Sequence, residues 1–263
     1  MKKHFTFFYV ALIVATLSFV ACNKDSDGGG KPGGGGGGGG DTNGLTITAT
    51  GVKNSSGAIK TVRAYAWWET DVDDGVDIIA EAPYQNNGFS LKLPATLANK
   101  YLWELGGLEY IFNVSDKNAK MLFFDEIYGC DIDNDEIGDF WCTSDWSNGE
   151  DYAVHYTSWI YVDRNVTIKG ELKDSYYDDY ELIEYESIQK LDLNLNKGWN
   201  VVYDSYTGIY DDPLRKYTET YSLTTQKPSG VNYQWYFEEY GDWWKSAQSK
   251  KSSLKSPFKN KKR

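Results

Sequence analysis

Alternation of apolar and polar residues is the feature that most constrains the fold of this chain. It occurs in five stretches, at residues 45–50, 62–68, 89–93, 191–195 and 233–237. Successive side chains of a strand point to opposite faces, so this period of two predicts strands with one buried and one solvated face. Such strands are typical of antiparallel sheets. The alternation therefore predicts an all-β, antiparallel fold.

Turn residues separate the predicted strands. Asn86-Asn87-Gly88 precedes the stretch 89–93, and Asn196-Lys197-Gly198 joins 191–195 to 199–203. Both segments offer residues that tolerate positive φ, as tight hairpins require. Asp163-Arg164-Asn165 is expected to turn the segment 159–162 into 166–169. Only residues 94–105 are compatible with a short helix.

The N-terminus has the pattern of a secretory signal peptide over residues 1–21, with two early lysines, an apolar stretch at 5–20 and Ala21. Cys22 at the cleavage site resembles a lipobox cysteine, whose thiol carries lipid such as palmitate in bacterial lipoproteins. The alternative is a transmembrane anchor, but Thr6, Thr16 and Ser18 dilute the apolar stretch and no basic cluster follows it. We expect a lipid-anchored protein of the outer membrane or cell surface.

Composition sets apart the two ends of the mature chain. Residues 22–43 are rich in glycine, which predicts a disordered tether. All charged residues of the segment 245–263 are Lys or Arg, which predicts a basic, disordered tail. Because the whole chain has a net charge of −11, the segment between them is strongly acidic. Phosphates would be repelled by it, so we expect no nucleic-acid partner.

Residues 44–244 are expected to form two β-sandwich-like modules. The first, 44–115, contains GAIKTVRAYAWWE (57–69) and NNGFSLKLP (86–94), which resemble the transthyretin-like or carboxypeptidase-regulatory-like sandwich. The second, 116–244, contains WIYVDRNVTIKGE (159–171) and LNLNKGWNVVY (193–203). These segments, in this order, resemble a family of uncharacterised Bacteroides-type surface lipoproteins. The resemblance implies a location in the envelope of Bacteroidetes and a β fold, and it implies no activity.

Two cysteines remain once Cys22 is assigned to lipid. Cys130 and Cys142 would close a short loop, and a bridge between them is favoured in an oxidising compartment. The alternative is a pair of free, buried thiols. A zinc site is disfavoured, because the mature chain has only these two cysteines and one histidine, His155.

The segment between these cysteines carries a candidate calcium site. Asp131, Asp133 and Asp135 present carboxylates at alternate positions, as calcium loops do. An EF-hand-type loop would need Gly at its sixth position and Glu at its twelfth, and this chain has Glu136 and Cys142 there. Calcium is therefore a possible ligand, and no cofactor is required.

Motifs of known enzyme classes are absent from the sequence, which has no G-x-S-x-G, H-E-x-x-H, P-loop or Rossmann pattern. A glycosidase needs only two carboxylates, and the sequence nominates no particular pair. Adjacent Trp67 and Trp68 must face opposite sides of a strand, so one is expected in the core and one accessible. Other aromatics lie close to predicted loops, where binding residues concentrate: Trp141, Trp146, Tyr176, Tyr177, Tyr180, Trp243 and Trp244.

Aromatic rings beside acidic and amide side chains are suited to sugars. We therefore expect a non-catalytic binding module, with glycans as the leading ligand class. The alternative is a structural or partner-binding envelope protein, and a glycosidase is the third reading.

Overall fold

The computed structural model describes residues 44–69, 74–124, 126–148, 151–178 and 182–240. These residues confirm the all-β prediction, since strands make up the fold apart from two single-turn 3-10 helices. In chain order the elements are β1 (Thr46–Thr50), β2 (Thr61–Glu69), β3 (Asp74–Pro83), β4 (Gly88–Lys92), η1 (Asn99–Tyr101), β5 (Trp103–Glu104), η2 (Leu108–Tyr110), β6 (Asn113–Val114), β7 (Lys120–Phe124), β8 (Ile127–Cys130), β9 (Glu136–Asn148), β10 (Asp151–Val162), β11 (Val166–Asp178), β12 (Ile183–Leu195), β13 (Gly198–Asp211), β14 (Lys216–Thr224) and β15 (Gln234–Glu239).

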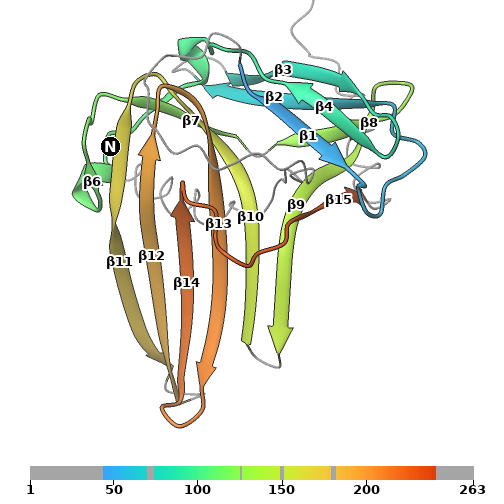
Figure 1. Cartoon of the computed structure of the whole chain (residues 1–263). Coiled ribbons are helices and arrows are strands. Elements are labelled where there is room, and N and C mark those ends of the chain that lie inside the picture. The colour runs from blue at the N-terminus through green and yellow to red at the C-terminus, as the bar shows by residue number, and fades with distance from the viewer. Residues whose placement is uncertain (1–43, 70–73, 125, 149–150, 179–181, 241–263) are drawn as a thin grey trace, which may run out of the picture.

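Most strands belong to one sheet. Its main path runs β3-β2-β8-β9-β10-β13-β14-β12-β11-β6, while β1 and β4 form a separate pair. The long strands β10–β14 stand side by side and extend beyond the compact end that contains β1–β4 and β8 (Figure 1). Every ladder is antiparallel except that between β12 and β14, which is parallel.

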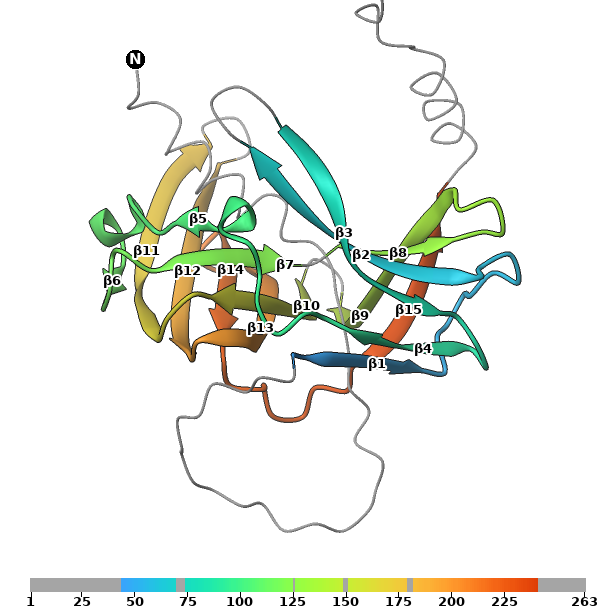
Figure 2. The ribbon, with the colours of Figure 1, turned by 90° about the horizontal axis from the view of Figure 1, so that it is seen from above.

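The sheet divides at β9. Near its start, Asp139 of β9 lies between Tyr128 of β8 and Glu238 of β15. Further along, Thr143 lies between Gln234 of β15 and Tyr156 of β10. Strands β8 and β10 therefore follow one another along the same edge of β9 and then diverge, and β15 occupies the other edge. Figure 2 shows this divergence from above.

Two main hydrophobic clusters stabilise the fold. The larger cluster lies where β1 and β4 cover the sheet of β2, β8, β9 and β15, and it contains Phe89, Phe140 and Trp235. Ring centroids of Phe89 lie 5.0 Å from both Phe140 and Trp235 in edge-to-face contacts, which aromatic pairs prefer. The second cluster joins β10–β14 to the segment 105–119.

The larger cluster contradicts the predicted division into modules 44–115 and 116–244. Phe89 comes from the first range, and Phe140 and Trp235 come from the second. In addition, β2 pairs with β8 across the predicted boundary. Sequence alternation identifies strands but not their partners, which is why the division was wrong.

The tight turn predicted at Asn86-Asn87-Gly88 is confirmed. Asn86 and Asn87 have φ of 52° and 59°, and Gln85 and Gly88 exchange backbone hydrogen bonds across them, as in a tight hairpin. Gly88 is required there for space, because a Cβ would lie 2.2 Å from the carbonyl oxygen of Ala49. The tight hairpin predicted at Asn196-Lys197-Gly198 is wrong, because this segment joins β12 to β13 and β12 pairs with β11 and β14 instead. Residues 163–165 do connect β10 to β11, but these two strands do not pair with each other. The only helix within residues 94–105 is the single turn η1, which is followed by the short strand β5.

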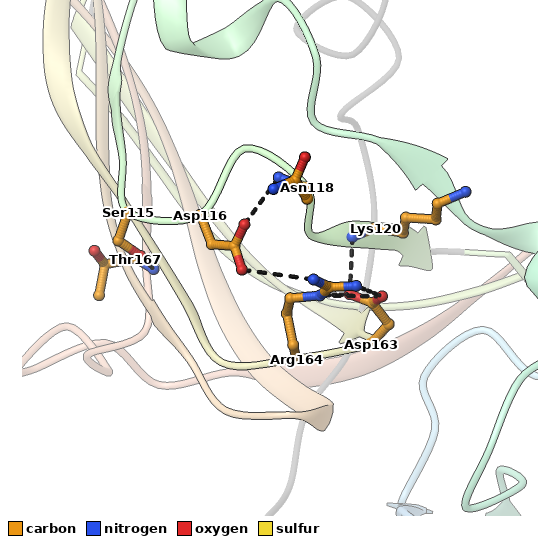
Figure 3. A network of polar contacts seen from close by, with 7 residues as sticks. All are labelled: Ser115, Asp116, Asn118, Lys120, Asp163, Arg164 and Thr167. Carbon is orange, nitrogen blue, oxygen red and sulfur yellow. Dashed lines mark hydrogen bonds and ion pairs between the residues drawn. The ribbon is translucent and has the colours of Figure 1, made fainter.

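The β10–β11 turn is held to the segment before β7 by a polar network (Figure 3). Arg164 Nη2 donates a 2.9 Å hydrogen bond to Asp163, and its Nη1 lies 3.7 Å from Asp116. The backbone N–H of Lys120 donates to the other oxygen of Asp163 at 2.9 Å. This network fixes the segment that covers the second cluster.

The lipid anchor at Cys22, the tether 22–43 and the tail 245–263 lie outside the described residues, so those predictions remain as they stand. None of the described helices has the length and apolarity needed to cross a membrane.

Candidate functional site

An open groove crosses three strands on one face of the sheet. Its volume is about 720 Å³. The residues that line it come from β9, β10, β15 and the loop after β1: Asn54, Trp141, Thr143, Val154, Tyr156, Tyr236, Phe237, Glu238 and Glu239. We call the face that carries Trp141 and Tyr156 the groove face.

Strand register places the three rings of the groove on this face. Tyr236 of β15 is opposite Trp141 of β9, and Tyr156 of β10 is opposite Thr143, two residues further along β9. Directly opposed residues of antiparallel strands point to the same side, so the rings form one surface. The intervening Phe140 and Phe237 are buried in the larger cluster. The aromatic groove is therefore the outer side of the same strands whose inner side forms the core.

Acidic groups surround the groove. Glu238 and Glu239 line it and are exposed. Glu238 is opposite Asp139, whose carboxylate accepts a hydrogen bond from Tyr240 Oη. Burial raises the pKa of Asp139 to about 6, and neighbouring Glu126 adds to this shift. The lining itself includes no Lys or Arg among the described residues.

The acidic face extends towards β2. Trp67 Nε1 donates a hydrogen bond to Glu126, and burial raises the pKa of that carboxyl above its usual value. The ring of Tyr65 packs edge-on against Tyr128, with centroids 5.3 Å apart. Burial is also the largest cause of the raised pKa of Tyr65, followed by its hydrogen bond with Glu136. Carboxylates and phenols thus continue beyond the groove on the same face.

The aromatic predictions have three outcomes. Trp67 is 53% exposed, which confirms that one of the two adjacent tryptophans is accessible. Trp68 is half-buried on the other face, with the Lys100 ammonium 4.5 Å from its ring centroid. Trp141 lines the groove, whereas Tyr176 and Tyr177 are exposed at the far end of β11. Tyr180, Trp243, Trp244 and the side chain of Trp146 lie outside the described residues.

The predicted calcium loop forms the β8–β9 turn. Asp131 Oδ1 accepts hydrogen bonds from the amides of Asp133 at 2.9 Å and Asp135 at 3.0 Å. The side chains of Asp133 and Asp135 are exposed. Within the described residues, no three or more His, Cys, Asp or Glu are arranged to hold a metal. Calcium binding stays a prediction.

The predicted Cys130–Cys142 disulfide is wrong in this structure, since Cys130 is a free, buried thiol. Cys130 is opposite Glu136, and Cys142 lies six residues further along β9, which corresponds to about 20 Å. A disulfide requires Cα atoms within about 7 Å of each other. Closeness in sequence was misleading because the chain between them runs away along an extended strand.

His155 has one polar partner on the opposite face. Its Nδ1 lies 2.8 Å from Ser205 Oγ, and burial lowers its pKa. Among the described residues no carboxylate is hydrogen-bonded to the ring, as a catalytic triad would require.

A buried carboxylate lies beside the groove. Asp204 is opposite Tyr156, is 2% exposed, and accepts hydrogen bonds of 2.5 Å from Ser158 and Tyr221. Burial raises its pKa to about 6. Its two partners lie on β10 and β14, 46 and 17 residues away in the chain, so no local motif identified it.

The groove residues Asn54, Tyr156, Tyr236, Glu238 and Glu239 were not among the sequence candidates. Tyr236 did belong to an alternating stretch, but alternation does not indicate which face remains open.

Comparisons with known proteins give no assignment. The chain matches no protein-family model, no curated protein and no solved structure. The resemblance to surface lipoproteins therefore stays a prediction.

Proposed function

We propose that this protein is a lipid-anchored, non-catalytic binding module of the cell surface, and that it binds glycans in the groove. The observation that carries the proposal is the meeting of Trp141, Tyr156 and Tyr236 on one open surface beside Glu238 and Asn54. Ligand sites typically combine aromatic surface with a few polar groups. Aromatic faces stack on the C–H faces of sugars, and carboxylate and amide groups bind their hydroxyls.

The arrangement of the carboxylates favours binding over hydrolysis. Three carboxyls on this face have a raised pKa, Glu126, Asp139 and Asp204, and none of them is in the groove lining. All three are already hydrogen-bonded: Glu126 accepts from Trp67, Asp139 from Tyr240, and Asp204 from Ser158 and Tyr221. A general acid must reach the leaving oxygen of the substrate, and none of these three carboxyls lines the groove.

The test is glycan-array binding by the full mature protein in detergent. We expect Trp141→Ala and Tyr236→Ala to weaken binding at least about tenfold, because stacking surface is lost. Trp141→Phe and Tyr236→Phe retain a ring and should retain most of the binding. Tyr110→Ala is the matched control, since Tyr110 is 88% exposed on η2, outside the groove lining. Equal binding by all variants at unchanged melting temperature would contradict the proposal, and turnover of a polysaccharide would favour a glycosidase.

The proposed anchor has its own test. The pattern around Cys22 supports lipid attachment, and two or more acyl chains give stable membrane attachment. We expect the wild-type protein to sediment with membranes and to partition into detergent. Cys22→Ser should release the protein or leave its precursor uncleaved. Recovery of a soluble, lipid-free wild-type protein from its native host would refute the anchor.

Partner binding is the second candidate function, and one observation favours it. Leu182 and Leu214 are 52% and 68% exposed in two adjacent turns at the far end of β11–β14. The turns touch, because Arg215 Nε donates a 2.9 Å hydrogen bond to the Leu182 carbonyl. Leu182→Ser with Leu214→Ser should reduce capture of an envelope protein if this reading is right, and should leave glycan binding unchanged if the groove reading is right.

A further inference from the structure

A row of tyrosines crosses the groove face on the long strands. Its members are Tyr176 on β11, Tyr185 on β12, Tyr217 on β14, Tyr206 on β13 and Tyr152 on β10, and we call this set the tyrosine row. Tyr176 and Tyr185 stack with ring centroids 5.1 Å apart, and Tyr185 meets Tyr217 edge-on at 5.8 Å. At the other end Tyr152 packs against Tyr206 at 5.3 Å.

The row is continuous across the sheet because Gly208 makes room for it. A Cβ on Gly208 would lie 2.4 Å from both Tyr152 Cε1 and Tyr217 Oη, so these two side chains meet above this glycine. Tyr152 also donates a 3.4 Å hydrogen bond to Glu219. The five strands span four strand spacings, or roughly 19 Å.

The row and the groove share one face. Tyr152 lies two residues before Val154 on β10, and Val154 lines the groove. Residues two apart on a strand point to the same side. Aromatic surface therefore extends from the groove towards the far ends of the long strands.

Solvent reaches one end of the row. Tyr176 is 64% exposed, whereas the second hydrophobic cluster includes Tyr221 and Tyr206 but does not include Tyr176, Tyr185 or Tyr217. Tyr176, Tyr185 and Tyr217 therefore lie outside the second hydrophobic cluster. Core packing does not explain why these rings are aligned.

The phenols of the row are neutral hydrogen-bond donors, and the charges on this face repel anionic ligands. Burial raises the pKa of Tyr152 and Tyr217 well above the usual phenol value and that of Tyr206 to about 12. These hydroxyls remain protonated donors at neutral pH. The charged residues that the registers place on this face of β10–β14 are acidic, for example Asp174 and Glu219, and no Lys or Arg of those described strands lies on it.

We propose that the tyrosine row binds the continuation of an extended, uncharged glycan chain whose first units occupy the groove. This inference rests on the proposed function and specifies its ligand as a chain of several sugars. Hydroxyl donors beside aromatic surface fit a neutral polyol, and a polyanion would be repelled by the acidic residues.

The experiment measures affinity against chain length with the full mature protein. The probes are neutral oligosaccharide series of two to eight units built from glucose, xylose, mannose, galactose or N-acetylglucosamine, with galacturonate oligomers as the anionic series. In any series that binds, wild-type affinity should rise by about tenfold or more between three and eight units, because the second surface is engaged by the same molecule. The galacturonate series should not bind.

The variant Tyr176→Ala with Tyr185→Ala should lose that gain and keep the affinity for the trisaccharide. Tyr177→Ala is the matched control, because Tyr177 is the adjacent residue, is 56% exposed, and points to the opposite face. If the double variant melts early, Tyr176→Ala alone is used, since this side chain is the most exposed of the row.

Two outcomes overturn the inference. Wild-type affinity that does not depend on length overturns it and leaves glycan binding in the groove intact. A length-dependent gain that survives the double variant also overturns it. If no series binds, the proposed function fails and the inference fails with it.

Discussion

The phenol of Tyr221 donates a 2.5 Å hydrogen bond to the carboxylate of Asp204, although that carboxylate is buried and no cation accompanies it among its hydrogen-bond partners. Ser158 supplies the second donor. An unpaired buried carboxylate is costly, and two hydrogen bonds offset this cost only in part. The pair lies where the apolar cluster of β10–β14 meets the groove, so Asp204 marks the boundary between core and binding face.

Asp204 predicts a pH dependence of stability. Burial raises its pKa to about 6, above the unfolded value of about 3.9, so the folded protein binds a proton more tightly than the unfolded chain. The stabilisation is full below pH 4 and is lost as pH rises through 6. We expect Asp204→Asn to remove this slope, which amounts to about 3 kcal/mol at most. Urea unfolding of the wild type and the variant at pH 4 to 7 measures this dependence. If the difference in free energy of unfolding between the two proteins does not change with pH, the prediction is wrong. Asp139→Asn is the comparison, because the pKa of Asp139 is also about 6.

Cys130 is expected to be an unreactive thiol. It is buried, and burial raises its pKa to about 11. We expect iodoacetamide to modify it only after unfolding, because the thiolate is the reactive form. Peptide mapping without reduction should find no Cys130–Cys142 cross-link. Detection of that linked peptide in the native protein would restore the disulfide predicted from sequence.

Two variants at the β10–β11 turn compare the exposed ion pairs of Arg164 with the partly buried hydrogen bond that Asp163 accepts. Arg164→Ala should change the free energy of unfolding little, because its pairs with Asp163 and Asp116 are exposed to solvent. Asp163→Ala should cost about 1–3 kcal/mol, because the Lys120 amide also loses its acceptor.

The pH dependence of this turn has the opposite sign to that of Asp204. The hydrogen bond from Arg164 lowers the pKa of Asp163, so its contribution is present above the unfolded pKa and is lost as pH falls. Denaturant titrations of both variants at pH 3 and pH 7 measure it. An equal cost for the two substitutions would contradict this account.

Gly208→Ala should displace the rings of the tyrosine row that pack over this glycine. The added Cβ would meet Tyr152 and Tyr217 at 2.4 Å, so both rings must shift. We expect a loss of about 1–3 kcal/mol, as for overpacked cores. Gly57→Ala is the control, because nothing lies within 4 Å of a Cβ at Gly57. Thermal melts of both variants measure the difference, and an unchanged melting temperature for Gly208→Ala would show that the rings are loosely held.

The acidic loop at Asp131 gives the last prediction. We expect a chelator to lower the melting temperature and calcium to restore it, with Asp133→Asn and Asp135→Asn each removing the response. Asp131→Ala should destabilise the turn by about 1–2 kcal/mol even without calcium, because two backbone amides lose their acceptor. Identical melts with calcium and with chelator would remove the ion and leave Asp131 as a turn-forming residue.

The candidate site was only partly predictable. Trp141 was a candidate because it lies close to a predicted loop, where binding residues concentrate, and Trp67 because adjacent residues of a strand face opposite sides. Tyr156 and Tyr236 carry no such signal, since the chain has 21 tyrosines and most strands include one. They are part of the site only because the register of β10 and β15 against β9 places them on the same face as Trp141.

The sequence by itself determined the local structure: which segments are strands, which side of each strand is apolar, and where Asn86-Asn87 must turn the chain. These properties depend on side-chain periodicity and on backbone conformations that few residues tolerate. The tertiary structure decided which strands pair. It joined β2 to β8 across the predicted module boundary, set β12 parallel to β14, and separated Cys130 from Cys142. Pairing partners and register depend on the complementarity of surfaces far apart in sequence, and no single segment encodes that complementarity.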